Sequence, residues 1–296
     1  MKENKARVIA FYLPQYHPIP ENDKYWGKGF TEWTNVAKAK PLFRGHYQPH
    51  IPADLGFYDL RLPEVREAQA ELARDAGIEG FCYYHYWFGN GKMLLQKPFE
   101  EVLRLGKPDF PFCLCWANHD WTTKTWVKGS SMVNNTMIAQ QEYLGEQDDI
   151  KHFEYCLRAF KDHRYITIEG KPIFLIYDPL SFPNVKEFMN RWNFLAKKNN
   201  LKGIYFIGVT TGRQSSYKIV TNLGFDGVCH NRRWEAEAKA AGFRFVRRMQ
   251  SLLGWHLGIS LMKYDYNKVV RNYDTPENKL ENCYPVITPG FDRTPR

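Results

Sequence analysis

The stretch Phe110-Pro-Phe-Cys-Leu-Cys-Trp-Ala-Asn-His-Asp-Trp121 runs from an apolar segment directly into polar and aromatic residues. Residues 112–116 are apolar, follow a proline and are too few for a stable helix, so they predict a buried strand. In parallel α/β folds, ligands bind at the carboxyl ends of the strands, where loops expose side chains that the strands hold in place. We therefore expect residues 118–121 to lie at a binding site. The alternative is an ordinary loop in which Asp120 caps a turn.

Short apolar runs of the same kind recur along the chain, and segments with helical periodicity separate most of them. The predicted strands are 7–13, 80–84, 112–116, 173–177, 204–209, 225–229 and 284–288. The predicted helices are 63–76, 94–105, 147–160, 185–199 and a helix-like segment at 264–272. Apolar strands that alternate with helices indicate a parallel sheet covered on both faces.

Seven such strands without a glycine-rich phosphate motif favour a (β/α)8 TIM-type barrel over a dinucleotide-binding sheet. We expect one barrel domain over residues 1–296. An eighth strand is missing from this count, and an incomplete barrel leaves unpaired sheet edges. We therefore expect that the chain is C-terminally incomplete and lacks the last strand-helix unit, or that one strand is overlooked.

The net charge and the cysteines indicate which partners and which compartment to expect. The chain has 296 residues, 44% of them hydrophobic, and a formal net charge of +9, which fits a nucleotide-sugar, an acidic glycan or a membrane surface as partner. The basic residues are scattered, which favours a merely basic surface, and no recognition motif indicates nucleic acid. The six cysteines show no metal-type spacing, so we expect buried, reduced thiols in a cytoplasmic protein. We expect no signal peptide and no transmembrane segment.

An aromatic segment of about forty residues follows the first predicted strand, and loops of this length are usually functional. It contains Glu32 between Thr31 and Trp33. Glu32 is a candidate general acid or base, and the alternative is an acidic residue that caps a turn.

The strand ends resemble the WbsX-like glycosyltransferase family, also described as glycoside hydrolase family 99-like. The residues that carry the resemblance are Ile9-Ala-Phe-Tyr-Leu-Pro-Gln-Tyr-His17, Trp26-Gly-Lys-Gly-Phe-Thr-Glu-Trp-Thr-Asn35, Lys40-Pro-Leu-Phe-Arg-Gly-His-Tyr-Gln-Pro49, Gly80-Phe-Cys-Tyr-Tyr-His-Tyr-Trp-Phe88, Phe110-Pro-Phe-Cys-Leu-Cys-Trp-Ala-Asn118 and Ile287-Thr-Pro-Gly-Phe-Asp292. The resemblance implies a (β/α)8 barrel that acts on glycosidic bonds in bacterial surface-polysaccharide metabolism, such as that of O-antigen or capsule. Members have been described as glycosyltransferases, and the related hydrolases cleave mannosidic linkages.

This sequence departs from the family pattern in two places. Many members have Trp-Ala-Asn-Glu-Asn-Trp at the third strand end, whereas this chain has His119 and Asp120 at the two variable positions. The paired acids of the related hydrolases lie on the last strand, in a stretch that is absent here. The resemblance therefore specifies the family and the fold, and it leaves both hydrolysis and transfer open.

Making or breaking a glycosidic bond requires a proton donor at the departing oxygen and a second group at the anomeric carbon. Asp120 is the first candidate carboxylate, because burial among aromatic rings would favour its protonated form. Glu32 is the second candidate, and His119 completes the expected catalytic set. Asp178 and Asp292 also lie at strand ends, where structural roles are favoured for both.

Sugar binding is indicated by a mixture of aromatic and polar side chains at successive strand ends, because pyranose rings stack on aromatics and their hydroxyls bind polar groups. The expected sugar-binding residues are Tyr16, His17, Trp33, His85, Trp87, Trp116, Asn118, Trp121, Asp178, His230 and Asp292. We expect Glu32, His85, Asn118 and Asp120 to surround one hollow. The alternative is that many of these aromatics belong to the core, as we expect for Tyr83 and Tyr84.

We expect no metal and no cofactor, because the histidines considered show no metal-type pair. The expected partner is an oligosaccharide or polysaccharide, with a nucleotide-sugar as a further candidate. The competing function is a non-catalytic sugar-binding barrel or a truncated, inactive family member.

Overall fold

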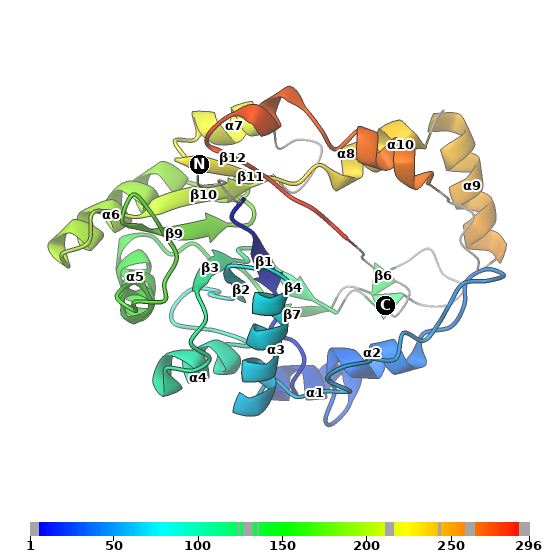
Figure 1. The fold of residues 1–296 in the computed structure, drawn as a ribbon, viewed down its shortest axis with the longest axis horizontal. Coiled ribbons are helices and arrows are strands. Elements are labelled where there is room, and N and C mark those ends of the chain that lie inside the picture. Colours follow the sequence, from blue (N-terminus) through cyan, green and yellow to red (C-terminus); the bar gives the residue numbers. More distant parts are fainter. Residues whose placement is uncertain are drawn as a thin grey trace.

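The computed structural model describes residues 6–123, 125–126, 133–134, 136–210, 216–241, 244–257 and 264–289. Its central feature is a curled sheet of parallel strands that are hydrogen-bonded in the order β1-β2-β3-β9-β10-β11-β12 (Figure 1). These strands are β1 (Ile9–Tyr12), β2 (Gly80–His85), β3 (Phe112–Trp116), β9 (Lys171–Ile176), β10 (Tyr205–Val209), β11 (Gly227–His230) and β12 (Cys283–Pro285). The α/β architecture with seven parallel strands is therefore confirmed. Among the described residues β1 and β12 are the two edges of the sheet.

The chain also contains short antiparallel strands, one paired with this sheet and four in separate ribbons. The strand β8 (Thr167–Ile168) pairs with the start of β9. Two small ribbons follow β3, one of β4 (Trp121–Thr122) with β7 (Met137–Ala139), and one of β5 (Thr125–Trp126) with β6 (Val133–Asn134). The segment after β3, expected to be a loop, therefore has its own secondary structure.

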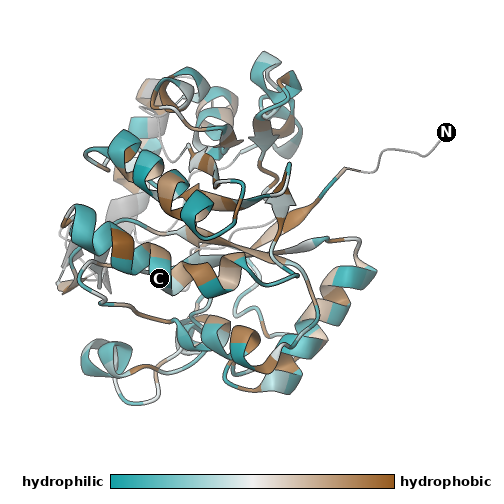
Figure 2. Ribbon diagram, turned by 90° about the vertical axis from the view of Figure 1, so that its left-hand side faces the viewer, coloured by the Kyte–Doolittle hydropathy of each residue, from teal (hydrophilic) through white to brown (hydrophobic). Residues whose placement is uncertain are grey.

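The helices that cover the sheet begin and end close to their predicted positions. They are α3 (Pro63–Asp75), α4 (Lys97–Leu105), α5 (Glu146–Phe160) and α6 (Val185–Lys198). The later part of the chain adds α7 (Tyr217–Asn222), α8 (Arg233–Ala240), α9 (Arg244–Leu257), α10 (Tyr266–Arg271) and the 3₁₀ turn η1 (Pro276–Lys279). Figure 2 shows the strands as a largely hydrophobic interior and the outward sides of these helices as hydrophilic. None of the described helices has the length and apolar character needed to cross a membrane.

The aromatic segment after β1 was expected to be a long loop, but it contains regular helices. It contains α1 (Pro20–Trp26) and α2 (Glu32–Lys38). A proline opens α1, and the Thr31 side chain accepts a hydrogen bond from the Trp33 backbone N–H at the start of α2. Glu32 is thus the first residue of a helix. An acidic residue in the first turn is stabilised there by the helix dipole.

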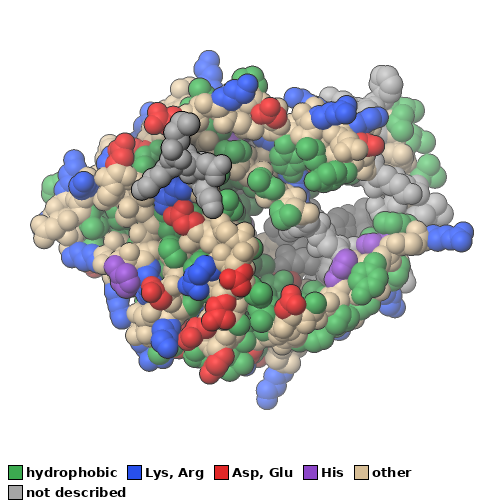
Figure 3. Space-filling model, viewed as in Figure 1, with side chains coloured by type: hydrophobic (Ala, Val, Ile, Leu, Met, Phe, Trp, Pro, Cys, Tyr) green, Lys and Arg blue, Asp and Glu red, His purple; other side chains and the backbone are tan. Residues whose placement is uncertain are grey.

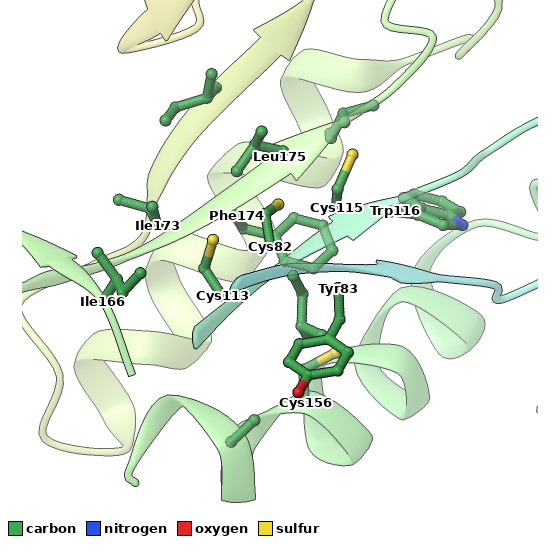
Figure 4. Packing of buried hydrophobic residues seen from close by; sticks show 14 of the residues in the cluster. Cys82, Tyr83, Cys113, Cys115, Trp116, Cys156, Ile166, Ile173, Phe174 and Leu175 are labelled. Atoms are coloured by element: carbon green, nitrogen blue, oxygen red, sulfur yellow. The ribbon is translucent and has the colours of Figure 1, made fainter. Parts of the chain in front are cut away.

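The two faces of the sheet have different roles. Cys82 pairs in register with Cys113, and Cys115 with Leu175, so these side chains point to the same, concave face (Figure 4). On the opposite face, Tyr83 and other aromatics pack beneath the helices. All six cysteines are buried and free, which confirms their prediction as small core residues.

Candidate functional site

The concave face of the sheet carries a group of half-buried rings at the carboxyl ends of the strands. Tyr84 lies near the end of β2 and Tyr177 directly follows β9, with their ring centroids 6.0 Å apart. Phe11 of β1 stacks on Tyr84 at 5.4 Å, and the His119 ring lies 5.4 Å from Tyr177. The parallel order of β1, β2, β3 and β9 brings these residues together although they are far apart in the sequence.

The phenol groups of Tyr84 and Tyr177 are protonated and make no hydrogen bond with the described residues. Burial raises the pKa of both Tyr84 and Tyr177, so both are neutral hydroxyls at physiological pH. Neither hydroxyl forms a hydrogen bond with another described residue, whereas the buried Tyr165 hydroxyl donates to the Ile173 carbonyl oxygen. The cation of Arg233, at the start of α8, is close enough to oppose the rise in the pKa of Tyr177. Figure 3 shows that the surface is hollowed between the part with α8 and α10 and the part with α2.

Asn118 joins the ends of β3 and β9. Its side-chain amide donates to the Asp178 carbonyl oxygen at 2.8 Å and to the Tyr143 hydroxyl at 2.9 Å. Its carbonyl oxygen accepts from the Asp178 backbone N–H at 2.7 Å. Asn118 is 1% exposed, and its side chain holds the ends of the two strands together.

An Asn118→Ala variant is expected to lose roughly 2–3 kcal/mol of unfolding free energy, because it removes the side-chain hydrogen bonds to the Asp178 backbone N–H and carbonyl oxygen and the one donated to the Tyr143 hydroxyl. Urea denaturation measures the loss. Asn190→Ala, at an exposed position on α6, is the control and should change the unfolding free energy by less than about 1 kcal/mol. Equal effects of the two substitutions would contradict the role assigned to Asn118.

His85, Trp87 and Trp116 do not lie on the concave face. His85 Nε2 is 2.8 Å from His152 Nε2 of α5, and the Trp87 ring stacks on His152 at 4.6 Å. Trp116 packs edge-on against the same imidazole and donates its indole N–H to the Trp87 carbonyl oxygen. All of these side chains are at most 5% exposed. His85, Trp87 and Trp116, which were predicted to bind sugar, are therefore packed beneath α5.

His85, His152 and Cys156 have the composition of a metal site. Their potential ligand atoms lie within 4.8 Å of one another, and His152 and Cys156 are four residues apart on one helix. Two nitrogens bound tetrahedrally to one zinc ion would lie about 3.3 Å apart, whereas these two lie at hydrogen-bond distance. Burial lowers the pKa of His85 to about 3 and also lowers that of His152. The pair is best described as two neutral imidazoles that share a hydrogen bond.

The three expected catalytic residues lie in different surroundings. Asp120 is exposed, and its Oδ1 accepts a hydrogen bond from the Gln141 backbone N–H at 2.8 Å. The burial expected for Asp120 is therefore not found, because the residue lies at the edge of the β4–β7 ribbon. Glu32 is partly buried at the start of α2, and His119 is the member of the set that reaches the Tyr177 ring. His85 does not belong to the hollow expected to unite it with Glu32, Asn118 and Asp120, because its imidazole faces α5 on the other side of the sheet.

Tyr16 and Trp33 are brought together, with ring centroids 4.7 Å apart, and the Trp33 indole donates to the Tyr58 carbonyl oxygen. His17 is only 1% exposed, and neither ring nitrogen has a partner within hydrogen-bond geometry. Burial lowers the pKa of His17 to about 4, against smaller opposing effects of Asp59 and of the Pro14 carbonyl. His17 is thus a neutral, enclosed side chain.

The remaining predicted residues have local structural contacts. Trp121 stacks on Tyr86 at 5.8 Å, and Asp178 accepts a hydrogen bond from the Ser181 hydroxyl at 2.8 Å. His230 is buried with its Nδ1 3.2 Å from Asn278 Oδ1, and burial lowers its pKa. Asp292 lies outside the described residues.

A separate cavity of about 260 Å³ lies between the starts of α5 and α6. It is lined by Tyr143, Asp149, Glu187, Arg191 and neighbouring residues, and Asp149 forms an ion pair with Arg191. Burial raises the pKa of Asp149 to about 6 although Arg191 opposes the rise. The lining comes from the starts of α5 and α6 and from the segments before them, and it includes neither Tyr84 nor Tyr177, so the cavity is distinct from the tyrosine cluster.

The sequence interpretation missed Tyr84 and Tyr177 as site residues. Tyr83, which is 2% exposed, was correctly placed in the core, but Tyr84 was placed there too. The sequence signal that separates Tyr84 from Tyr83 is the alternation of side chains along a strand, in which consecutive residues point to opposite faces. If Tyr83 faces the helices, Tyr84 must face the concave side.

The sequence matches the protein family described as glycosyltransferase WbsX over residues 8–296. It is 34% identical over 291 residues to an uncharacterized protein, WxcX, of Xanthomonas campestris pv. campestris strain B100, and equally to WxcX of strain ATCC 33913. The match covers 98% of this chain and 39% of the relative, so the chain spans about two fifths of the length of these curated relatives.

A comparison with solved structures matches a GH99 endo-alpha-mannosidase from Bacteroides thetaiotaomicron in complex with bis-tris-propane. The TM-score is 0.48 at 16% identity, covering 85% of this chain and 66% of that one. A glycoside hydrolase-like protein has a TM-score of 0.47 at 15% identity, covering 85% and 64%. The family match covers nearly the whole chain, and by it this protein belongs to the WbsX glycosyltransferase family.

Proposed function

We propose that this protein is a carbohydrate-active enzyme that makes or breaks glycosidic bonds of bacterial surface polysaccharide and binds its sugar at the tyrosine cluster. The observation that carries the proposal is the pair Tyr84 and Tyr177, whose hydroxyls have no partner among the described residues. Their rings offer stacking faces and their hydroxyls offer hydrogen bonds, which is the mixture that a pyranose requires. The family match over residues 8–296 supports a sugar as ligand.

The chemistry of the bond requires a proton donor and a group that stabilises positive charge at the anomeric carbon. His119 is the candidate that contacts the cluster directly, through the Tyr177 ring. Asp120 is its sequence neighbour and is exposed to an incoming ligand, and Glu32 is the second carboxylate candidate. Hydrolysis and transfer share this requirement. Mass analysis of the products with and without a nucleotide-sugar distinguishes the two reactions.

The test is a glycan panel in which binding and turnover are measured separately. Turnover that is lost in Asp120→Asn or Glu32→Gln while binding persists would support an enzyme with these groups in its mechanism. Turnover that neither substitution changes would reject both assignments.

A non-catalytic sugar-binding protein is the second candidate function. Two carboxylates at the strand ends already accept hydrogen bonds within the chain, Asp120 from the Gln141 N–H and Asp178 from the Ser181 hydroxyl. Structural roles for these carboxylates favour a protein that binds sugar without catalysis. Binding of an oligosaccharide without conversion, under any of the conditions tested, would establish this function. The cytoplasm is the proposed compartment, because all six cysteines are free thiols.

Tyr84→Phe is expected to weaken sugar binding about three- to tenfold, since it removes one hydrogen bond to the ligand and keeps the ring. Isothermal titration calorimetry measures the affinity. Tyr83→Phe is the matched control, because Tyr83 is the adjacent residue of β2 and lies on the helix-facing side. The control should bind sugar as the wild type does. A loss in Tyr83→Phe as large as that in Tyr84→Phe would place the site elsewhere.

A further inference from the structure

We propose that the exposed apolar face of α9 binds the surface of an anionic membrane. Five large hydrophobic side chains of this helix are exposed, namely Phe245 (74%), Val246 (48%), Met249 (44%), Leu252 (49%) and Leu253 (49%). Such side chains are normally buried, and a contiguous exposed group of them marks an interaction surface.

The spacing of these residues places them on one side of the helix. Positions 245, 249 and 252 follow one another at intervals of four and three, and positions 246 and 253 lie beside them, seven apart. At 100° per residue the five positions fall within an arc of about 120°. A 14-residue helix is about 21 Å long, so it presents a continuous apolar stripe to a partner.

The charge of the sequence in and beside α9 favours anionic lipid over a second copy of the chain. From residue 238 to residue 264 the sequence contains no Asp or Glu, but it contains Lys239, Arg244, Arg247, Arg248 and Lys263. Two copies packed through this face would bring their positive charges together. An anionic lipid surface neutralises these charges and accepts the apolar side chains at the boundary between headgroups and acyl chains.

Neighbouring helices expose aromatic residues of the kind found at membrane interfaces. Trp234 of α8 is 48% exposed and its ring lies under the Arg233 guanidinium, 4.6 Å from the centroid. Tyr266 of α10 is 76% exposed. The helices α8, α9 and α10 lie together at one end of the molecule (Figure 1), and Figure 3 shows hydrophobic side chains gathered there.

Co-sedimentation with vesicles tests the proposal. The wild-type chain is expected to bind mixed phosphatidylcholine–phosphatidylglycerol vesicles, to bind phosphatidylcholine vesicles much more weakly, and to be released by high salt. The double variant Phe245→Ser/Leu252→Ser is expected to bind about tenfold more weakly, because it removes two apolar anchors. Phe194→Ser is the matched control, since Phe194 of α6 is 68% exposed and lies outside the proposed face. Circular dichroism verifies that each variant is folded.

The proposal would be overturned by no binding of the wild type to the mixed vesicles, by binding that the double variant retains, or by an equal loss in Phe194→Ser. Self-association in the absence of vesicles that the double variant abolishes would assign the face to a second copy of the chain, and would also overturn it. The vesicle assay needs no sugar, so its outcome is independent of the proposed function.

Discussion

A fall in pH from 7 to 4.5 is expected to lower the unfolding free energy by about 3 kcal/mol, because buried imidazoles must remain neutral in the folded chain. Burial lowers the pKa of His17 to about 4 and that of His85 to about 3. A histidine in the unfolded chain takes up a proton near pH 6.5. The stability that each neutral imidazole contributes is therefore fully present above pH 6.5 and is lost progressively below it.

The magnitude follows from about 1.4 kcal/mol per pH unit for each group. The contribution of His17 to the unfolding free energy falls by about 2.5 kcal/mol between pH 6.5 and 4.5. The hydrogen-bonded pair of His85 and His152, taken as one titrating group, loses about the same amount. Asp149 acts in the opposite direction, because burial raises its pKa to about 6 and the folded chain takes up a proton there. This gain offsets about 2 kcal/mol. Urea denaturation at the two pH values measures the net loss.

His17→Leu tests the origin of this pH dependence. Both ring nitrogens of His17 are buried without hydrogen-bond partners, so leucine removes a titrating group and breaks no bond. The variant is expected to lose about 2.5 kcal/mol less than the wild type on acidification. His163→Gln is the control, because His163 has an 83% exposed side chain. An unchanged pH dependence in His17→Leu would show that His17 is not a neutral, enclosed group.

The strands were predictable because each is a short apolar run with polar residues after it, as in Phe112–Trp116. The helices α1 and α2 were not, because each has seven residues and neither buries a regular apolar stripe. Their positions depend instead on local signals, a proline at the start of α1 and the Thr31 cap of α2. A one-dimensional pattern detects a helix by its buried face, so helices without such a face are missed.

The candidate site was predictable only in part. The sequence placed aromatic and polar residues at the carboxyl ends of the strands, but it did not show on which face of the sheet each side chain lies. His85 and Trp116 end β2 and β3 on the side that faces α5, whereas Tyr84 and His119 reach the concave cluster. A shift of one residue reverses the face, and both faces of a parallel sheet are apolar. The hydrophobic pattern of the sequence therefore could not show which side chains lie on the concave face of the sheet.

Trp192→Ala is expected to lower the unfolding free energy by about 3–5 kcal/mol, the largest effect of a single substitution considered for this fold. Trp192 of α6 is fully buried, and its ring packs against Phe174 of β9 and Phe188 of α6 at 4.8 and 4.6 Å. Its indole N–H donates to the Asp149 carbonyl oxygen in α5 at 2.9 Å. The substitution opens a cavity at the junction of two helices with the sheet and removes the hydrogen bond from α6 to that carbonyl oxygen.

The matched control is Phe194→Ala, because Phe194 lies two residues further along α6 and is 68% exposed. It removes an aromatic ring of similar size from the same helix without opening a cavity, so its effect should be below about 1 kcal/mol. Because α5 also carries His152, loss of Trp192 loosens the layer that holds His85 and Trp116 behind the concave face. Sugar binding by Trp192→Ala at low temperature should then weaken along with stability. If instead the variant unfolds at the wild-type urea concentration, the contact between α6 and the sheet is not what holds the tyrosine cluster in place.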